Sequence, residues 1–199
     1  MPTDLNFAAV TGTVQGHKLY SDSQYPWAWI RLRIGRVPYL DASGEPKHIE
    51  PSTLFLNFSV PKTKMEALDR VEKGKWLAVW ELVLDDYKKD DKTLYKLRGS
   101  VSKFIISDKS MPNINITTIA GRVSDQSKDG NWYRMGMSYL NPMEKDQRKK
   151  WKMRFAKIYS PYLELSVGSR YLVVGGVCGT DPEGKDGLIV VANTAVKGA

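Results

Sequence analysis

Short runs in which apolar and polar residues alternate fill the first 110 positions, and turn-forming residues separate them. Alternation places one set of side chains in a core and the other toward solvent, so each run predicts a β-strand. After the third run, Met65, Leu68 and Val71 recur at helical spacing behind Pro61, a residue that favours a first helical turn. The pattern predicts strands at 7–15, 27–37, 53–60, 75–84 and 93–106, and a short helix at 62–71.

The order of these elements is three strands, a helix and two strands. That order is typical of the OB-fold, a five-stranded Greek-key barrel with a helix between strands three and four. Residues 38–51 are rich in Pro, Gly and Asp and are expected to form a loop, and the charged stretch 85–92 a hairpin tip. The first part of the chain is therefore predicted to be an all-β barrel.

The same pattern starts again after a linker at 107–113. A last strand at 187–196 corresponds to the fifth strand of the first copy. Together these matches predict two tandem OB-folds, 1–110 and 111–199, each with a short helix or turn between strands three and four. The matching segments are 10–14 with 119–123, 29–31 with 132–134, and 73–79 with 167–174.

One stretch of the second copy allows two interpretations. Residues 144–159 have the spacing of a basic amphipathic helix, with Trp151, Phe155 and Tyr159 four residues apart. The repeat instead predicts a strand near 150–158, followed by a short turn or helix. We favour the strand because Gly168 fixes the register of the strand that follows.

The composition excludes several classes of protein. With 199 residues, 42% hydrophobic and 26% charged, the chain resembles ordinary globular proteins. It has no apolar run near the roughly 20 residues of a membrane span, and its N-terminus lacks a secretory signal. The single cysteine, Cys178, and the two histidines, His17 and His48, exclude a disulfide framework and disfavour a zinc site. We expect a cytoplasmic protein with no metal, no cofactor and no membrane partner.

The charge points to an anionic partner. The formal net charge is +8, and the chain holds six tryptophans and ten tyrosines. Positive charge binds phosphates and flat rings stack on unpaired bases, so this combination suits single-stranded nucleic acid. A solvated basic surface without a partner is the alternative that charge alone leaves open.

The predicted strand 27–37 has two contrasting faces. Ala28, Ile30, Leu32 and Ile34 suit a barrel core, whereas the alternate positions hold two tryptophans and two arginines. An unpaired guanidinium group costs several kcal/mol to bury, so the second set must face outward. It then forms a stacking platform with phosphate ligands beside it, unless the rings pack under a loop or in an interface. The outward set is Trp27, Trp29, Arg31 and Arg33.

Other strands supply weaker candidates. Phe55 lies on the outward side of strand three, and Lys96 and Arg98 share one side of strand five. In the second copy, Trp132 and Arg134 share a face. A basic run with one tryptophan leads into the third strand of that copy. Such runs are most often solvated surface, and the candidates for backbone contact are Lys149, Lys150, Trp151 and Lys152.

Strand four contains two further tryptophans. Trp76 and Trp80 share a side with Ala78. Strand four lies away from the strands that usually hold the ligand in OB-folds. We therefore expect both rings to pack in the core or in a subunit interface.

Residues 53–84 resemble the core of bacterial-type single-stranded DNA-binding proteins, through an apolar strand, a short helix, Lys73-Gly74 and the alternating Leu77-Ala78-Val79. The resemblance implies an OB-fold whose outer aromatic residues stack on bases. At the matching positions the chain has Trp27, Trp29 and Phe55. It departs from the common form of the family in its two barrels and in the absence of an acidic tail for recruiting partner proteins. That departure leaves room for a homodimer of double barrels.

The sequence is compatible with three classes of function. No nucleotide-binding, nucleophile-elbow or metalloprotease motif is present, so we expect a protein that is not an enzyme. The favoured function is binding of single-stranded DNA, largely without sequence preference, during replication, recombination or repair. The alternatives are an RNA-binding OB protein and a tandem-barrel scaffold whose exposed tryptophans bind a protein.

Overall fold

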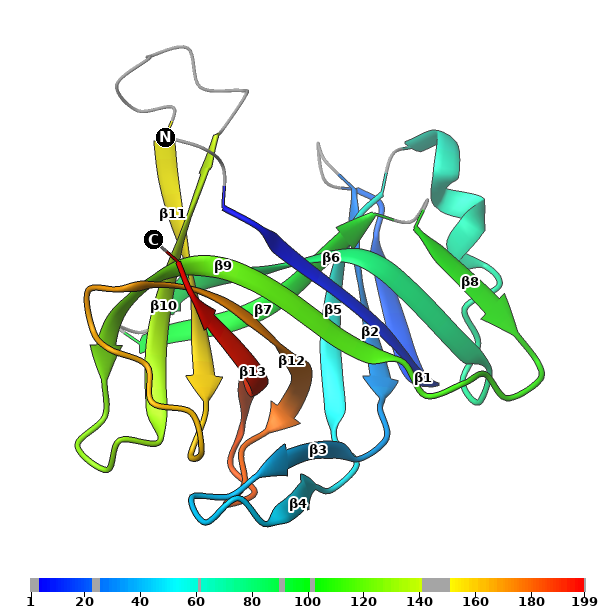
Figure 1. Cartoon of the computed structure of the whole chain (residues 1–199). Helices are drawn as coiled ribbons and strands as arrows, with labels where there is room; N and C mark the ends of the chain where they lie inside the picture. Colours follow the sequence, from blue (N-terminus) through cyan, green and yellow to red (C-terminus); the bar gives the residue numbers. More distant parts are fainter. Residues whose placement is uncertain are drawn as a thin grey trace.

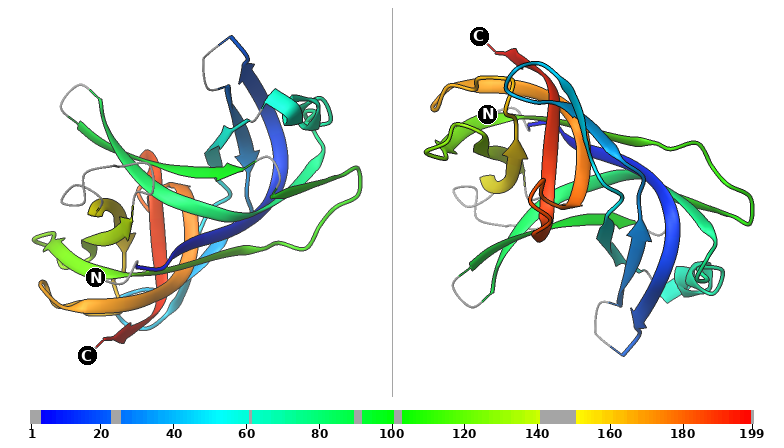
Figure 2. Two further views of the ribbon diagram at one scale, coloured as in Figure 1. Left: turned by 90° about the horizontal axis from the view of Figure 1, so that it is seen from above. Right: turned by 90° about the horizontal axis from the view of Figure 1, so that it is seen from below.

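The chain forms two β-barrels that share one continuous eleven-stranded sheet (Figure 1). This computed structural model describes residues 4–22, 26–60, 62–89, 92–100, 103–140 and 151–198. Views from above and below show the two barrels at opposite ends of the molecule (Figure 2). The all-β class and the two five-stranded barrels in tandem are as the alternation predicted.

The first barrel closes through pairing of its first strand with two neighbours. β1 pairs with β2 on one side and with β6 on the other, and β5 pairs with β7 in parallel. The 3-10 helix η1 (Lys62–Leu68) lies between β5 and β6, so the predicted helix at 62–71 is shorter and tighter than expected. The ring consists of β1 (Asn6–Tyr20), β2 (Trp27–Arg33), β5 (Thr53–Ser59), β7 (Lys92–Ser100) and β6 (Trp76–Lys89).

The second barrel repeats this ring. β11 forms the strand that the repeat required, so the helical interpretation of that stretch is wrong. Residues 160–169 form bends and turns where the first barrel has η1. The ring consists of β9 (Asn115–Gln126), β10 (Trp132–Leu140), β11 (Trp151–Tyr159), β13 (Asp186–Lys197) and β12 (Arg170–Thr180).

Matching hydrogen bonds explain the sequence repeat. Gly74 and Gly168 both have positive φ, at 92° and 85°. The Gly74 N–H donates to the Val14 carbonyl at 2.9 Å, and the Gly168 N–H donates to the Val123 carbonyl at 2.8 Å. The same turn therefore fastens the fourth strand to the first strand in both barrels.

Three local predictions are wrong in detail. The expected loop at 38–51 contains a hairpin of β3 (Val37–Leu40) and β4 (Pro46–Ile49), which packs on the second barrel where Tyr39 meets Tyr159 at 5.4 Å between ring centroids. The expected strand at 93–106 is split into β7 and β8 (Phe104–Ser107), which flank β6 on its two sides. The expected tip at 85–92 is mostly strand, because β6 runs to Lys89 and β7 starts at Lys92.

The two barrels are joined by antiparallel pairing of β1 with β9. Ala8 lies opposite Thr117 and both are buried, whereas Ala9 lies opposite the exposed Ile116. Directly opposed residues of antiparallel strands point to the same side. Both barrel interiors therefore lie on one side of this seam, and the other side is an open sheet surface. The barrels consequently face each other across a cleft.

No helix within the described ranges is long and apolar enough to cross a membrane. Among the same residues, His, Cys, Asp and Glu side chains form no cluster of three or more that could hold a metal ion.

Candidate nucleic-acid interface

The outer sides of β2 and β5 form one surface, which we call the first-barrel face. Its members are exposed or half-buried, while the alternate residues of both strands are buried, as the alternation predicted. Phe55 is 58% exposed, and its ring centroid lies 6.3 Å from that of Trp29. The Arg31 guanidinium lies 5.8 Å from the Trp29 ring. The face consists of Trp27, Trp29, Arg31 and Arg33 of β2 with Phe55 and Asn57 of β5.

Trp27 stands apart from the other two rings of this face. It stacks on Tyr20, with 4.1 Å between ring centroids and 8° between planes. Lys18 in turn lies 4.8 Å from the Tyr20 ring. One side of the Trp27 ring is therefore occupied.

The two candidates on β7 have different surroundings. Lys96 lies 4.6 Å from the Tyr87 ring, which leaves its charge next to an aromatic surface. Arg98 forms an ion pair with Asp85 at 3.0 Å, and Asp85 also pairs with Arg154 of the second barrel at 3.3 Å. Arg98 therefore contributes less free positive charge to the interface than Lys96.

The outer sides of β10 and β11 form the second-barrel face. The Arg134 guanidinium lies 3.6 Å from the Phe155 ring, and the Lys157 ammonium lies 3.9 Å from the Trp132 ring. Trp132 also contacts Tyr159 at 4.8 Å between centroids, so its ring is half-buried. The face consists of Trp132 and Arg134 of β10 with Phe155, Lys157 and Tyr159 of β11.

The second-barrel face is turned toward the first barrel. The Phe155 N–H donates to the Asp86 carboxylate of β6 at 2.9 Å. Burial raises the pKa of Tyr95, and the neighbouring Arg134 opposes that rise, so β7 and β10 approach each other here. Burial beside Tyr39 likewise raises the pKa of Tyr159 to about 12. The predicted pair Trp132 and Arg134 therefore lies at the boundary between the barrels.

The basic run is described only in part. Trp151 and Lys152 begin β11 and are both exposed. Lys149 and Lys150 lie outside the described residues. Their contact with nucleic acid stays a prediction, as does that of every candidate on the two faces.

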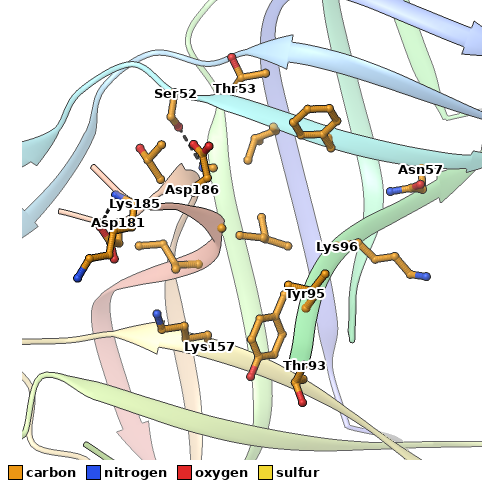
Figure 3. A pocket seen from close by; sticks show the side chains of 18 of the residues that line it. Ser52, Thr53, Asn57, Thr93, Tyr95, Lys96, Lys157, Asp181, Lys185 and Asp186 are labelled. Atoms are coloured by element: carbon orange, nitrogen blue, oxygen red, sulfur yellow. Dashed lines mark hydrogen bonds between the residues drawn. The ribbon is translucent and has the colours of Figure 1, made fainter. Parts of the chain in front are cut away.

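A cavity of about 640 Å³ opens between the two barrels (Figure 3). Thr53 and Phe55 of β5 border it on one side, and Tyr95 and Lys96 of β7 on another. Lys157 reaches it from β11, and Asp181 and Lys185 of the turn between β12 and β13 border it together with Asp186 at the start of β13 (Figure 3). The cavity therefore takes residues from strands of both barrels.

Sequence reasoning missed two residues of this region, Tyr87 and Tyr95, whereas Lys157 belongs to the basic run that was predicted to contact the nucleic-acid backbone. Tyr87 contacts Lys96 within the β6–β7 hairpin, whereas Tyr95 lines a cavity that β7 forms with strands of the second barrel, which are distant along the chain. The signal within the sequence was that Tyr87 lies in the predicted charged tip at 85–92 and Tyr95 just after it, where OB-folds place a ligand-binding loop.

Trp76 and Trp80 are half-buried on the outer side of β6, since Leu77 and Val79 fill the core. The expectation that they pack in the core is therefore wrong, and the expectation of an interface remains. Ala78, between them, lies opposite Ile105 of β8, which is 57% exposed. This part of β6 belongs to the open sheet surface behind the seam.

Comparison with solved structures finds the same architecture in the single-stranded DNA-binding protein of Thermus aquaticus. The wild-type protein matches with a TM-score of 0.66 and 16% sequence identity, over 100% of this chain and 95% of that chain. A deletion variant of the same protein matches with a TM-score of 0.66 and 16% identity, over 100% and 97%. No protein-family model matches the sequence, and no curated protein matches it either. Over its whole length, the chain shares the OB-fold architecture of this bacterial single-stranded DNA-binding protein.

Proposed function

We propose that this protein binds single-stranded DNA, largely without sequence preference, and protects it during replication, recombination or repair. The supporting observation is the first-barrel face, on which the half-buried Trp29 and the exposed Phe55 lie beside Arg31 and Arg33. Every base has a flat surface, so such rings stack on any exposed base. The adjacent guanidinium groups suit the phosphates. The protein acts as a binder and not as an enzyme.

RNA is the second candidate ligand. The rings and cations of the first-barrel face are suited to either nucleic acid, because neither group reads the 2′-hydroxyl. DNA is favoured through the shared fold with the Thermus aquaticus protein. Comparison of oligo(dT) with poly(U) in the same titration decides between them.

Tryptophan fluorescence is expected to be quenched strongly by oligo(dT) and weakly by duplex DNA. In the duplex the bases are stacked on each other, so the rings have no free base to contact. The affinity for oligo(dT) is expected to fall with salt at a slope of about −2 in log K against log salt, from about −0.7 for each of Arg31, Arg33 and Lys96. Equal affinities for single strand and duplex, or a slope near zero, would contradict the proposal and favour a protein-binding scaffold.

We also propose that the active form is a homodimer. The outer surface of the shared sheet, behind the seam, is largely apolar across β8, β6, β1, β9 and β12, and contiguous exposed apolar surfaces mark interaction sites. It lies opposite the cleft, so dimerisation there would leave both binding faces open. Its exposed members are Ile105, Ile116, Leu172 and Val174.

Sedimentation equilibrium tests the dimer. The wild-type protein is expected at twice the 22.5 kDa of one chain. Replacing both Ile116 and Leu172 with lysine is expected to give a single-chain mass, because burying the charges in an apolar interface is unfavourable. Val167→Lys, an equally exposed apolar position outside this surface, is the control and is expected to stay dimeric. A monomeric wild-type protein would refute the dimer.

A further inference from the structure

The cavity between the barrels connects the two faces. Phe55 belongs to the first-barrel face and also borders the cavity. Lys157 covers the Trp132 ring of the second-barrel face and also borders the cavity. A strand that runs from one face to the other must therefore pass the cavity, because the seam closes the opposite side of the molecule.

The shape of the cavity is held by contacts between the barrels. The Gly179 N–H of β12 donates to the Ser52 hydroxyl, just before β5, at 3.0 Å. At the other end, Asp85 pairs with Arg154 of β11 at 3.3 Å, and Asp86 accepts from the Phe155 N–H. The opening is thus fixed by both barrels before any ligand arrives. Its volume lies within the roughly 300–1,000 Å³ of small-molecule sites.

The charges around the cavity favour an anion. Its lining includes four basic and two acidic side chains. The Asp181 carboxylate already accepts the N–H groups of Glu183 and Lys185 at 3.0 and 2.9 Å, and the Lys185 ammonium pairs with Glu183. The other three basic residues of the lining are Arg33, Lys96 and Lys157. Among the described residues, no carboxylate lies within 4.0 Å of any of these three side chains.

The interior between these charges is apolar and aromatic. Leu54, Leu94 and Leu188 line it together with the rings of Phe55 and Tyr95. Around this lining, Asn57 and Thr93 offer hydrogen-bonding groups. This combination suits a ligand that has a flat ring with polar edges and an attached phosphate. A nucleotide has these groups.

We propose that this cavity receives one unstacked nucleotide of the bound strand, and so guides the strand from the first barrel to the second. Its base lies between Phe55 and Tyr95, and its phosphate lies near Lys96 and Lys157. The proposal rests on the proposed function, since the nucleotide belongs to the same single strand. A free small molecule would also fit the apolar lining, but its binding would not explain why the cavity is continuous with both faces.

Photocrosslinking locates the nucleotide. Oligo(dT) containing 4-thiothymidine is bound to the full chain and irradiated, and crosslinked peptides are identified by mass spectrometry. Crosslinks are expected at Tyr95, inside the cavity, as well as at Trp29 on the first-barrel face. Crosslinks confined to Trp29 and its neighbours, with none at Tyr95, overturn the proposal and leave the proposed function intact. Failure of the wild-type protein to bind oligo(dT) overturns both.

Two variants test the cavity in a different way. Thr93→Trp fills the cavity without removing a ring or a charge, and Tyr95→Ala removes one ring; each is expected to lower the affinity about tenfold. Tyr162→Ala, an exposed tyrosine outside the cavity, is the matched control and is expected to keep wild-type affinity. Because Tyr95 is half-buried, Thr93→Trp decides the outcome if Tyr95→Ala is unstable. Wild-type affinity in Thr93→Trp overturns the proposal.

Discussion

Replacing Trp29 and Phe55 together with alanine is expected to weaken binding of oligo(dT) by about thirtyfold or more. Stacking of one base on an aromatic ring contributes roughly 1–3 kcal/mol, so the loss of two rings removes at least about 2 kcal/mol. The two rings are neighbours, 6.3 Å apart, and both lie outside the barrel. The melting temperature is therefore expected to change little while the affinity falls.

The conservative pair Trp29→Phe with Phe55→Tyr serves as the control for this prediction. It keeps both rings and is expected to bind within a few-fold of the wild-type protein. Fluorescence anisotropy of a labelled oligo(dT) measures the affinity, and a thermal melt confirms folding. An alanine double variant that binds like the wild-type protein would place the interface elsewhere, for example on the second-barrel face around Arg134.

The facing of individual side chains was predictable because it follows from local geometry. In β2, the buried Ala28, Ile30 and Leu32 alternate with the outward Trp29 and Arg31, and nothing outside the strand is needed to derive this. The prediction for Trp76 was wrong in part. It placed the ring in the core or in an interface because strand four lies away from the usual ligand strands, whereas Leu77 and Val79 fill the core and Trp76 lies half-buried on the outer side of β6.

The relation between the barrels was not predictable from local patterns. The second-barrel face turns toward the first barrel because β1 pairs with β9, and the sequence pattern of neither strand indicates that pairing. Asp85 illustrates the consequence. The sequence placed it at a charged hairpin tip, whereas in the structure it forms ion pairs with Arg98 of the first barrel and Arg154 of the second. The cavity depends on such long-range contacts. The sequence therefore indicated individual aromatic and basic residues of its lining, but not that they lie together.

The repeat around Gly12 and Gly121 was visible in the sequence, and the structure supplies its physical reason. A Cβ atom at Gly12 would lie 2.3 Å from the carbonyl oxygen of Arg33, and one at Gly121 would lie 2.4 Å from that of Gly136. Each glycine thus lets the first strand of its barrel approach the backbone of the second strand. A larger residue must push the two strands apart, since a backbone carbonyl cannot rotate away as a side chain can.

Gly12→Val and Gly121→Val are each expected to destabilise the protein by about 3 kcal/mol or more. For a chain of this length, the melting temperature falls by roughly 2–4 °C per kcal/mol, so a drop of about 6–12 °C is expected. Gly198→Val is the control, because a Cβ there meets its nearest neighbour, the Arg170 Cβ, at an ordinary 3.6 Å. A melting temperature equal to that of the control in either variant would contradict the prediction.

The same two variants test how the chain divides into folding units. We propose that 1–110 and 111–199 are separate domains, because each contains a closed ring of five strands. In Gly12→Val, the amides of β2 and β5 are then expected to lose protection from hydrogen exchange more than those of β10 and β12. In Gly121→Val, the amides of β10 and β12 are expected to lose more protection, since each clash lies inside one ring. Equal loss of protection in both barrels from either variant would mean that the β1–β9 seam makes the chain one cooperative unit.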